Sequence, residues 1–234
     1  MTLSLKGFEN FFRYYRGHDW QRQGIASLYE SLRVEFPDLL HENSAWVDAY
    51  RGEADTILLD VPYEYQLDNG PTGSRECFSS SMAMLAKFAG ANVKDDRDYL
   101  TKLKPFGDTT DPFAHIHTLK FLGVNARFRQ DATPDDIETH LRNGNPVACG
   151  WLHKGHVNSP HGGGHWSVIC GCTPDEWIHL DPNGEADMIN GGYVNHTHGD
   201  CIKYSRKNWE KRWLVDGPAT GWMISLETRT HTDK

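Results

Sequence analysis

The 234-residue sequence lacks both a long apolar run and a dense cluster of basic residues. A membrane-spanning helix needs about 18 or more consecutive apolar residues, and no such run is present, so we expect no membrane partner. Proteins that bind nucleic acid rely on clustered Lys and Arg, whereas this chain has a formal net charge of -8. Its richest basic stretch, residues 203–212, fits one face of a short helix. We therefore also expect no nucleic-acid partner.

The N-terminus lacks the pattern of a secretory signal. A signal peptide requires an apolar core of about 7–15 residues and a small-residue cleavage site. Here Lys6, Glu9, Arg13 and Arg16 interrupt the apolar residues. The sequence therefore predicts a cytoplasmic protein, and a phage-encoded protein would fit the same observation.

Cysteine is scarce, and an odd, sparse set is a poor disulfide framework for a chain of this length. We expect a reduced chain in which most thiols are buried. At least one cysteine is then free to do chemistry. The five cysteines are Cys77, Cys149, Cys170, Cys172 and Cys201.

The remaining composition is that of a folded protein, with 38% hydrophobic and 24% charged residues. The length suits one large domain, or a domain with a small appendage. Aromatic residues at spacings of three and four, such as Phe8, Phe11 and Phe12, predict helices at the start of the chain. We assign residues 1–52 to a helical N-terminal region and residues 53–234 to the main domain.

In the main domain, helices are expected mostly before the strands. Apolar spacing predicts helices over residues 77–89 and 111–122, and Thr133 followed by proline and two acids predicts a further helix start. Strands are predicted at residues 57–61, 146–152, 165–172, 176–181 and 222–226, with a loop over residues 153–164. Helices followed by an antiparallel sheet indicate an α+β fold.

Cys77 stands where a polar loop meets the helix predicted for residues 77–89. Backbone N–H groups and the helix dipole at such a position favour a thiolate, the reactive form of cysteine. His165 begins a predicted strand directly after three glycines, which allow a substrate to approach closely. Taken alone, each residue also fits a structural role, as a small buried thiol or a half-buried histidine. Together they are a candidate nucleophile and general base.

Two further residues complete the pattern. Asp181 ends the next predicted strand, so a short turn between antiparallel strands would bring it near His165. A carboxylate there can fix the tautomer of the ring, which leaves the other ring nitrogen to exchange a proton with the cysteine. Gln66 lies in the loop before Cys77. Its side-chain amide and the Cys77 N–H would supply two donors to an oxyanion.

Residues 61–88, VPYEYQLDNGPTGSRECFSSSMAMLAKF, resemble the start of the C39-like papain-fold peptidase family. The segments NPVACGW, GGGHWSVICGC and WIHLDPNG resemble the rest of its pattern, in which a proline–valine strand precedes a histidine strand and an Asp-Pro turn follows. The resemblance covers residues 57–226 and implies a papain-like cysteine peptidase fold, with helices packed on an antiparallel sheet. It implies no cofactor. The site residues that it implies are Cys77 as nucleophile, His165 as base, Asp181 as orienting residue and Gln66 at the oxyanion.

The sequence departs from that family in two places. Members often have glycine directly after the cysteine, where this chain has Phe78, and the loop predicted between His153 and Gly164 is long enough to cover the cleft. Both departures concern the range of substrates. The N-terminal segment GFENFFRYYRGHDWQRQGIASL is similar to helical segments that precede lytic or peptidase domains in cyanobacterial and phage proteins.

Three alternatives stay open. Histidine and cysteine are zinc ligands, and seven of them lie close together in the sequence, although no CxxC pair or HExxH motif is present. A binding module that kept the fold without catalysis would also fit the pattern, and so would an acyl transferase. Cys170 and Cys172 are expected on one face of their strand. The seven residues are His153, His156, His161, His165, Cys170, Cys172 and His179.

We expect a cysteine peptidase or amidase that hydrolyses a peptide bond. The leading candidate substrates are peptidoglycan peptides, cut by a phage endolysin, and the alternative is a peptidase that processes a protein partner. The glycines beside His165 would admit a small or D-configured residue near the thiolate. The net charge of -8 opposes docking on an anionic cell wall.

Overall fold

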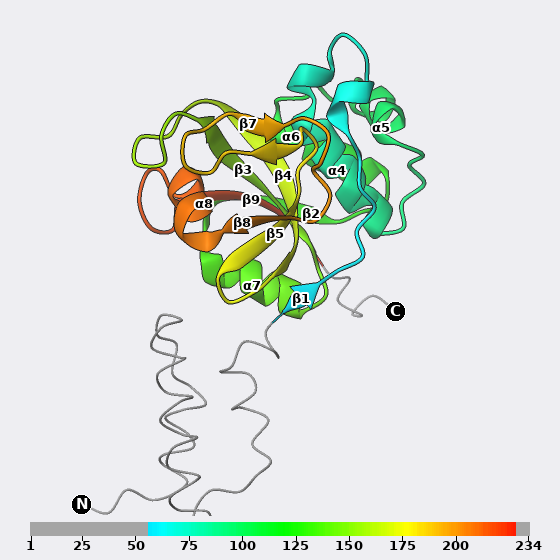
Figure 1. Ribbon diagram of the computed structural model, residues 1–234. Helices are drawn as coiled ribbons and strands as arrows, with labels where there is room; N and C mark the ends of the chain where they lie inside the picture. The colour runs from blue at the N-terminus through cyan, green and yellow to red at the C-terminus, as the bar shows by residue number, and fades with distance from the viewer. Residues whose placement is uncertain (1–55, 228–234) are drawn as a thin grey trace, which may run out of the picture. The chain divides into compact units, whose positions relative to one another are not determined.

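The computed structural model describes residues 56–227 (Figure 1). The helical region predicted for residues 1–52 lies outside this range. Among the described residues, no helix is both long and apolar enough to cross a bilayer.

An antiparallel sheet of seven strands runs through the described residues (Figure 1). Six of its strands follow the order β2-β9-β3-β4-β5-β8, and β1 pairs with β4 beside this path. Two short strands, β6 and β7, form a separate sheet. The strands are β1 (Ile57–Leu58), β2 (Ala126–Ala132), β3 (Val147–Lys154), β4 (His161–Cys172), β5 (Glu176–Leu180), β6 (Glu185–Ala186), β7 (Tyr193–Asn195), β8 (Ile202–Ser205) and β9 (Gly221–Leu226).

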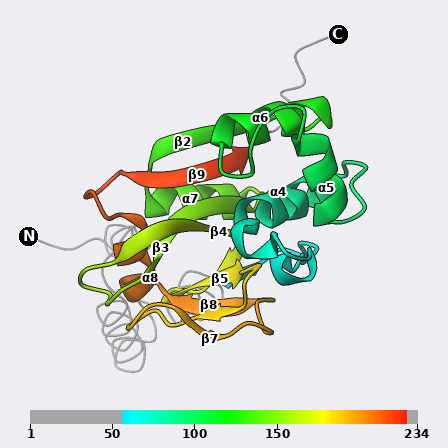
Figure 2. The same ribbon diagram turned by 90° about the horizontal axis from the view of Figure 1, so that it is seen from above.

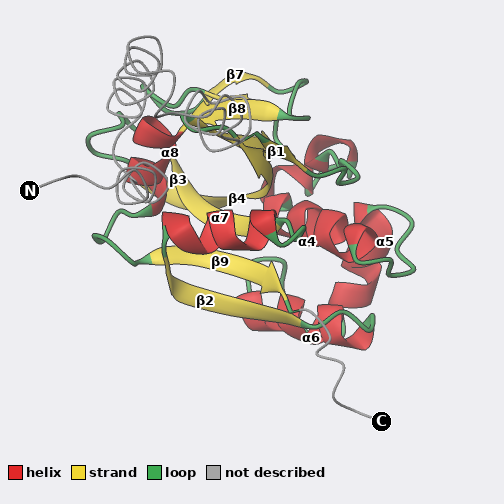
Figure 3. Ribbon diagram, turned by 90° about the horizontal axis from the view of Figure 1, so that it is seen from below, coloured by secondary structure: helices red, strands yellow, loops and turns green. Residues whose placement is uncertain are grey.

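Helices cover both faces of the large sheet (Figures 2 and 3). One hydrophobic cluster joins α4, α5 and α6 to one face, and a second cluster joins α7 and α8 to the other. This arrangement confirms the α+β prediction. The helices are α4 (Cys77–Phe88), α5 (Asp96–Leu103), α6 (Pro112–Phe121), α7 (Pro134–Arg142) and α8 (Arg206–Trp213), and two 3₁₀ turns, η1 (Gln66–Asp68) and η2 (Gly73–Arg75), precede α4.

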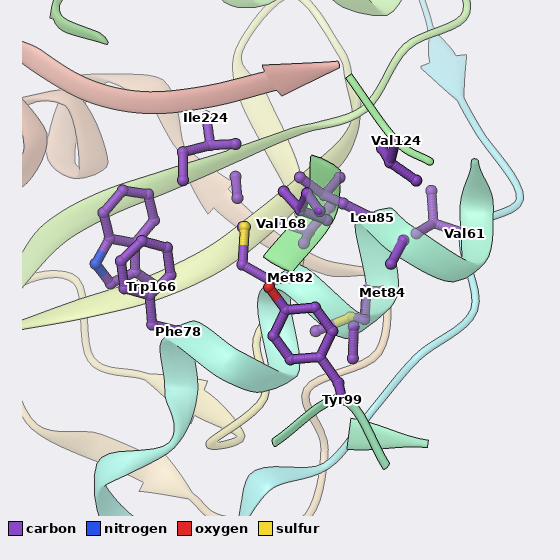
Figure 4. Packing of buried hydrophobic residues seen from close by; sticks show 14 of the residues in the cluster. Val61, Phe78, Met82, Met84, Leu85, Tyr99, Val124, Trp166, Val168 and Ile224 are labelled. Atoms are coloured by element: carbon purple, nitrogen blue, oxygen red, sulfur yellow. The ribbon is translucent and has the colours of Figure 1, made fainter. Parts of the chain in front are cut away.

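A stacked pair of rings connects α4 to the sheet (Figure 4). The rings of Phe78 and Trp166 lie with their centroids 3.8 Å apart and their planes 2° apart. Gly150 of β3 makes room for the indole, because a Cβ atom there would lie 2.8 Å from the Trp166 ring. Phe78 follows Cys77 in the sequence and Trp166 follows His165. The stack therefore fixes the helix relative to the strand one residue away from each candidate site residue.

Local sequence signals explain where the predicted helices begin. The Thr133 hydroxyl accepts a hydrogen bond from the Asp136 N–H, and the Asp136 carboxylate accepts one from the Thr133 N–H, so α7 starts with a capping box. Asp111 caps α6 through its hydrogen bond from the Phe113 N–H. The helices predicted over residues 77–89 and 111–122 are confirmed to within two residues.

The sequence did not predict α5, β2 or the strands β6, β7 and β8. β2 lies at the edge of the sheet and reads ARFRQDA, so its charged residues face solvent and conceal its alternating pattern. The basic stretch of residues 203–212 does not form a single helix, since its first residues belong to β8 and the rest to α8.

Two sequence predictions around β4 are wrong. The loop expected over residues 153–164 is shorter, because Leu152 pairs with Gly164 and Lys154 with His161. Backbone pairing across the hairpin thus outweighs the weak strand preference of the three glycines. Cys170 and Cys172 do not share a face. A bulge at Cys170 shifts the register of β4 against β5, so the two side chains enter opposite hydrophobic clusters.

Candidate active site

Cys77 is the first residue of α4 and is partly exposed. Glu76, which precedes it, forms no side-chain capping bond. The thiol therefore sits at the positive end of the helix dipole, close to N–H groups that no cap from Glu76 satisfies.

The other four thiols are less suited to nucleophilic chemistry. Burial raises the pKa of Cys149, Cys170 and Cys172. The more exposed Cys201 also has a raised pKa, through burial and then through its hydrogen bond with Asp200. Because the thiolate is the reactive form, raised pKa values make these four cysteines poor nucleophiles at neutral pH.

His165 lies on β4 and is buried between partners on its two sides. Its Nε2 lies 2.8 Å from Asp181 Oδ1, and the Cys77 side chain lies near enough to the ring to raise its pKa. Since Nε2 faces the carboxylate, Nδ1 is the nitrogen left for the thiol. The structure therefore brings the helix start, the strand and the aspartate together in the order Cys77, His165, Asp181.

The charges of its neighbours set the protonation of His165. Burial lowers the pKa of the imidazole, but the negative charge of Asp181 and then that of Cys77 outweigh burial and raise the pKa to about 10. The imidazolium is thus the favoured form at neutral pH, held between Asp181 and the Cys77 side chain.

Asp181 follows β5 and is fully buried. Its Oδ1 also accepts a hydrogen bond of 3.0 Å from the Asn183 N–H, and its Oδ2 accepts one of 3.0 Å from the Tyr204 hydroxyl. The Tyr63 hydroxyl binds its backbone carbonyl at 3.0 Å. Sequence reasoning missed Tyr204, because only the pairing of β5 with β8 brings it beside Asp181.

Gln66 opens η1 and is buried. Its backbone N–H donates to the Pro182 carbonyl at 2.9 Å, and its Nε2 donates to the Gly73 carbonyl at 2.9 Å. The loop that carries Gln66 is thereby tied to the residue after Asp181 and to η2, the turn that leads into Cys77. An amide nitrogen carries two hydrogens, so one N–H of Gln66 remains for a further acceptor.

Aromatic side chains surround the His165 ring. Trp151, His153 and Tyr193 lie edge-on to it, with ring centroids 5.2, 5.6 and 5.7 Å away. Burial, followed by the charge of His165, lowers the pKa of His153 to about 4. His153 is therefore neutral at pH 7 and adds no second positive charge beside His165.

The histidines and cysteines considered for zinc do not converge. Within residues 56–227, no three His, Cys, Asp or Glu side chains gather as metal ligands. His179 instead binds the Ser167 hydroxyl at 2.9 Å, which in turn accepts the indole N–H of Trp151. The bulge at Cys170 separates the two cysteines of β4.

An antiparallel sheet flanked by helices, with a cysteine at a helix start beside a histidine that an aspartate holds, is the arrangement of a papain-like cysteine peptidase. The chain belongs to the family of the papain-like cysteine protease AvrRpt2, whose model matches residues 55–190. This membership confirms the prediction that the chain is a cysteine peptidase. No curated protein is significantly similar to it in sequence.

One solved structure with a TM-score above 0.5 supports the fold. A C39-like peptidase from Bacillus anthracis superimposes with a TM-score of 0.53 at 16% identity, covering 75% of this chain and 99% of that one. A double glycine motif protease from an AMS/PCAT transporter has a TM-score of 0.46 at 14% identity, covering 73% and 94%. The peptidase domain of Streptococcus ComA has a TM-score of 0.43 at 16% identity, covering 66% and 93%. The predicted C39-like, papain-like fold is confirmed.

Proposed function

We propose that the chain hydrolyses peptide bonds with Cys77 as nucleophile, His165 as acid and base, and Asp181 as the residue that orients the imidazole. The observation that carries this assignment is that Asp181 holds Nε2 of His165 by a hydrogen bond while the Cys77 side chain acts on the same ring. The position of Cys77 at the start of α4 supports it.

In the first half of the reaction, the Cys77 thiolate attacks the carbonyl carbon of the scissile bond. The C–N bond then breaks, and His165 gives its proton to the leaving amine, which leaves a thioester and a neutral imidazole. In the second half, His165 takes a proton from water as the oxygen attacks the thioester. The C–S bond breaks, the acid product leaves, and the thiolate and imidazolium are restored.

The negative oxygen of each tetrahedral intermediate needs hydrogen-bond donors. The backbone N–H of Cys77 and the unused N–H of Gln66 are the donors that we assign to it. The tie between Gln66 and Pro182 supports this role, because it links the loop of the amide to the turn that carries Asp181. A donor of this kind typically contributes about 10²–10³-fold in turnover.

For the substrate, we propose short peptides with a small or D-configured residue near the scissile bond, with peptidoglycan peptides as the leading case. Support comes from Gly163 and Gly164 of β4, just before His165. Both are exposed, and a Cβ atom at either would meet no atom within 4 Å. The face of the strand that carries the imidazole is therefore open at Gly163, where a side chain would otherwise project.

The test incubates the full chain with purified peptidoglycan and, separately, with a panel of unfolded proteins. We expect new amino termini to be released from the cell wall by the wild-type chain and by Cys201→Ser, but not by Cys77→Ala. Cleavage of proteins alone would replace the cell-wall substrate with a protein partner. Products joined to an added amine would instead identify an acyl transferase. Activity that survives in Cys77→Ala would refute the assignment of the nucleophile.

A further inference from the structure

The second oxygen of Asp181 depends on a residue outside the proposed triad. Asp181 is fully buried, and its Oδ1 serves both His165 Nε2 at 2.8 Å and the Asn183 N–H at 3.0 Å. Its Oδ2 receives the hydroxyl of Tyr204 at 3.0 Å. A buried carboxylate is costly unless its oxygens are hydrogen-bonded. Tyr204 therefore satisfies the half of Asp181 that the histidine does not reach.

The hydroxyl of Tyr204 is held as a donor toward this oxygen. It accepts the Ala186 N–H at 2.9 Å, which directs its single hydrogen to another acceptor. The Asp181 carboxylate lies nearer than the alternative acceptor, the Gly184 carbonyl at 3.4 Å. Burial, and then the charge of Asp181, raises the pKa of Tyr204 well above its ordinary value. The phenol thus stays protonated throughout the range in which the enzyme can work.

Packing also fixes the ring of Tyr204. The residue is 2% exposed, and its ring lies 4.9 Å from the His179 ring and 6.0 Å from the Trp151 ring, centroid to centroid. Trp151 in turn stands edge-on to His165. A hydroxyl held by a buried ring is a rigid support, whereas a water molecule in its place would exchange.

We propose that Tyr204 is a positioning residue, which keeps the Asp181 carboxylate aligned so that Nδ1 of His165 points at Cys77. The inference rests on the proposed triad. Tyr204 touches neither substrate nor the reacting atoms, and it acts through Asp181. Six titratable groups face His165 and Asp181 from the elements around them. They are Cys77 of α4, His153 of β3, His179 of β5, Tyr63, Tyr193 of β7 and Tyr204 of β8.

The test is Tyr204→Phe in the full chain, which removes the hydroxyl and keeps the ring. We expect kcat to fall about 10–100-fold, as is usual for the loss of a hydrogen bond to a charged group, with KM changed less than about twofold. The acidic limb of the pH profile should move to higher pH, because a carboxylate without its donor takes up a proton more readily. Tyr99→Phe is the matched control, since its buried hydroxyl binds His115 and does not touch Asp181.

The rate at which iodoacetamide alkylates Cys77, measured across pH, tests the proposed triad and the role of Tyr204 separately. If Cys77 of the wild-type chain reacts no faster than Cys201, the proposed triad itself fails. If the wild-type chain reacts fast and Tyr204→Phe gives the same pH profile, only the role of Tyr204 is refuted. Thermal unfolding of Tyr204→Phe, compared with that of Tyr99→Phe, checks that the variant folds, and Tyr204→Phe is also made in the Asp181→Asn background. Since Tyr204 acts through the carboxylate, we expect no further loss of turnover there, and a further loss of 10-fold or more would overturn the inference.

Discussion

At the scale of single residues, the role of each side chain in the site follows from which of its atoms contacts which neighbour. Asp181 occupies Nε2 of His165, so the proton that matters for chemistry sits on Nδ1. The pKa of about 10 for His165 comes from two negative neighbours outweighing burial. Removing either neighbour therefore changes the charge of the imidazole as well as its orientation.

We predict that Asp181→Asn retains more activity than His165→Ala. An asparagine can still orient the ring but carries no charge, whereas alanine removes the group that carries the proton. Steady-state kinetics on both variants measure the difference, with thermal unfolding as the control for folding. Equal and complete loss in two well-folded variants would contradict separate roles for the two residues.

Several of these residues were predictable from the sequence, for identifiable reasons. Cys77 begins a helix, Asp181 follows a strand, and His165 stands at the start of the strand predicted for residues 165–172, so their mutual placement could be inferred from α+β topology. Tyr204 was not predictable, since its strand is short and polar and its partner is 23 residues away. His153 was considered only as a zinc ligand and not as a neighbour of His165, because its strand continues beyond the last residue predicted for it.

At the scale of elements, the loop before α4 is built around the Gln66 amide. Gly73 of η2 offers its carbonyl to this side chain, and a Cβ atom on Gly73 would lie 2.3 Å from the Gln66 backbone oxygen. A side chain at position 73 would therefore displace the backbone of the loop. Its helical turns are too short for periodicity to predict, which is why the sequence indicated only a polar loop here.

We predict that Gln66→Ala lowers kcat by about 10²–10³-fold with little change in KM, the usual cost of removing one oxyanion donor. Steady-state kinetics on a saturable peptide substrate provide the measurement. Gln130→Ala, on the exposed edge strand β2, is the matched control. A change confined to KM would make Gln66 a substrate-contact residue and remove it from the oxyanion site.

Sequence patterns could not predict the register of β4. Strict alternation would place Cys170 and Cys172 on one face of the sheet. The extra residue at the bulge moves the side chains that follow it, including Cys172, to the opposite face. The glycines at 162–164 led to a loop prediction where the structure has a strand. Glycine is uncommon in strands, yet here the pairing with β3 is set by the residues on either side.

At the scale of the whole molecule, the buried His115 and His179 and the half-buried His153 are held in the neutral form. Burial lowers the pKa of His115 and His153 to about 4, and that of His179 well below its ordinary value. An unfolded chain binds protons at these positions near the ordinary pKa of about 6.5. Between about pH 6.5 and 4 the unfolded state therefore holds more protons than the native state at these sites, and acid favours unfolding.

We predict that the midpoint of thermal unfolding falls as the pH is lowered through this window. The buried carboxyls of Glu64 and Asp96, whose pKa values burial raises, oppose the trend at its lower end. His115→Gln should weaken the pH dependence, whereas a change at the exposed His196 should not. A midpoint that stays constant from pH 7 to 4.5 would show that these histidines do not govern acid stability.

The stack of Phe78 on Trp166 has a consequence for anyone who wishes to engineer this enzyme. The thiol and the imidazole come from two separate layers, and their alignment is set by a neighbouring pair of rings and by the space that Gly150 leaves for one of them. Transfer of Cys77, His165 and Asp181 alone to another scaffold would supply the reacting side chains without the ring stack that aligns them. A minimal graft would also include the helix residues around Phe78 and the strand residues around Trp166, with glycine kept at position 150 opposite the indole.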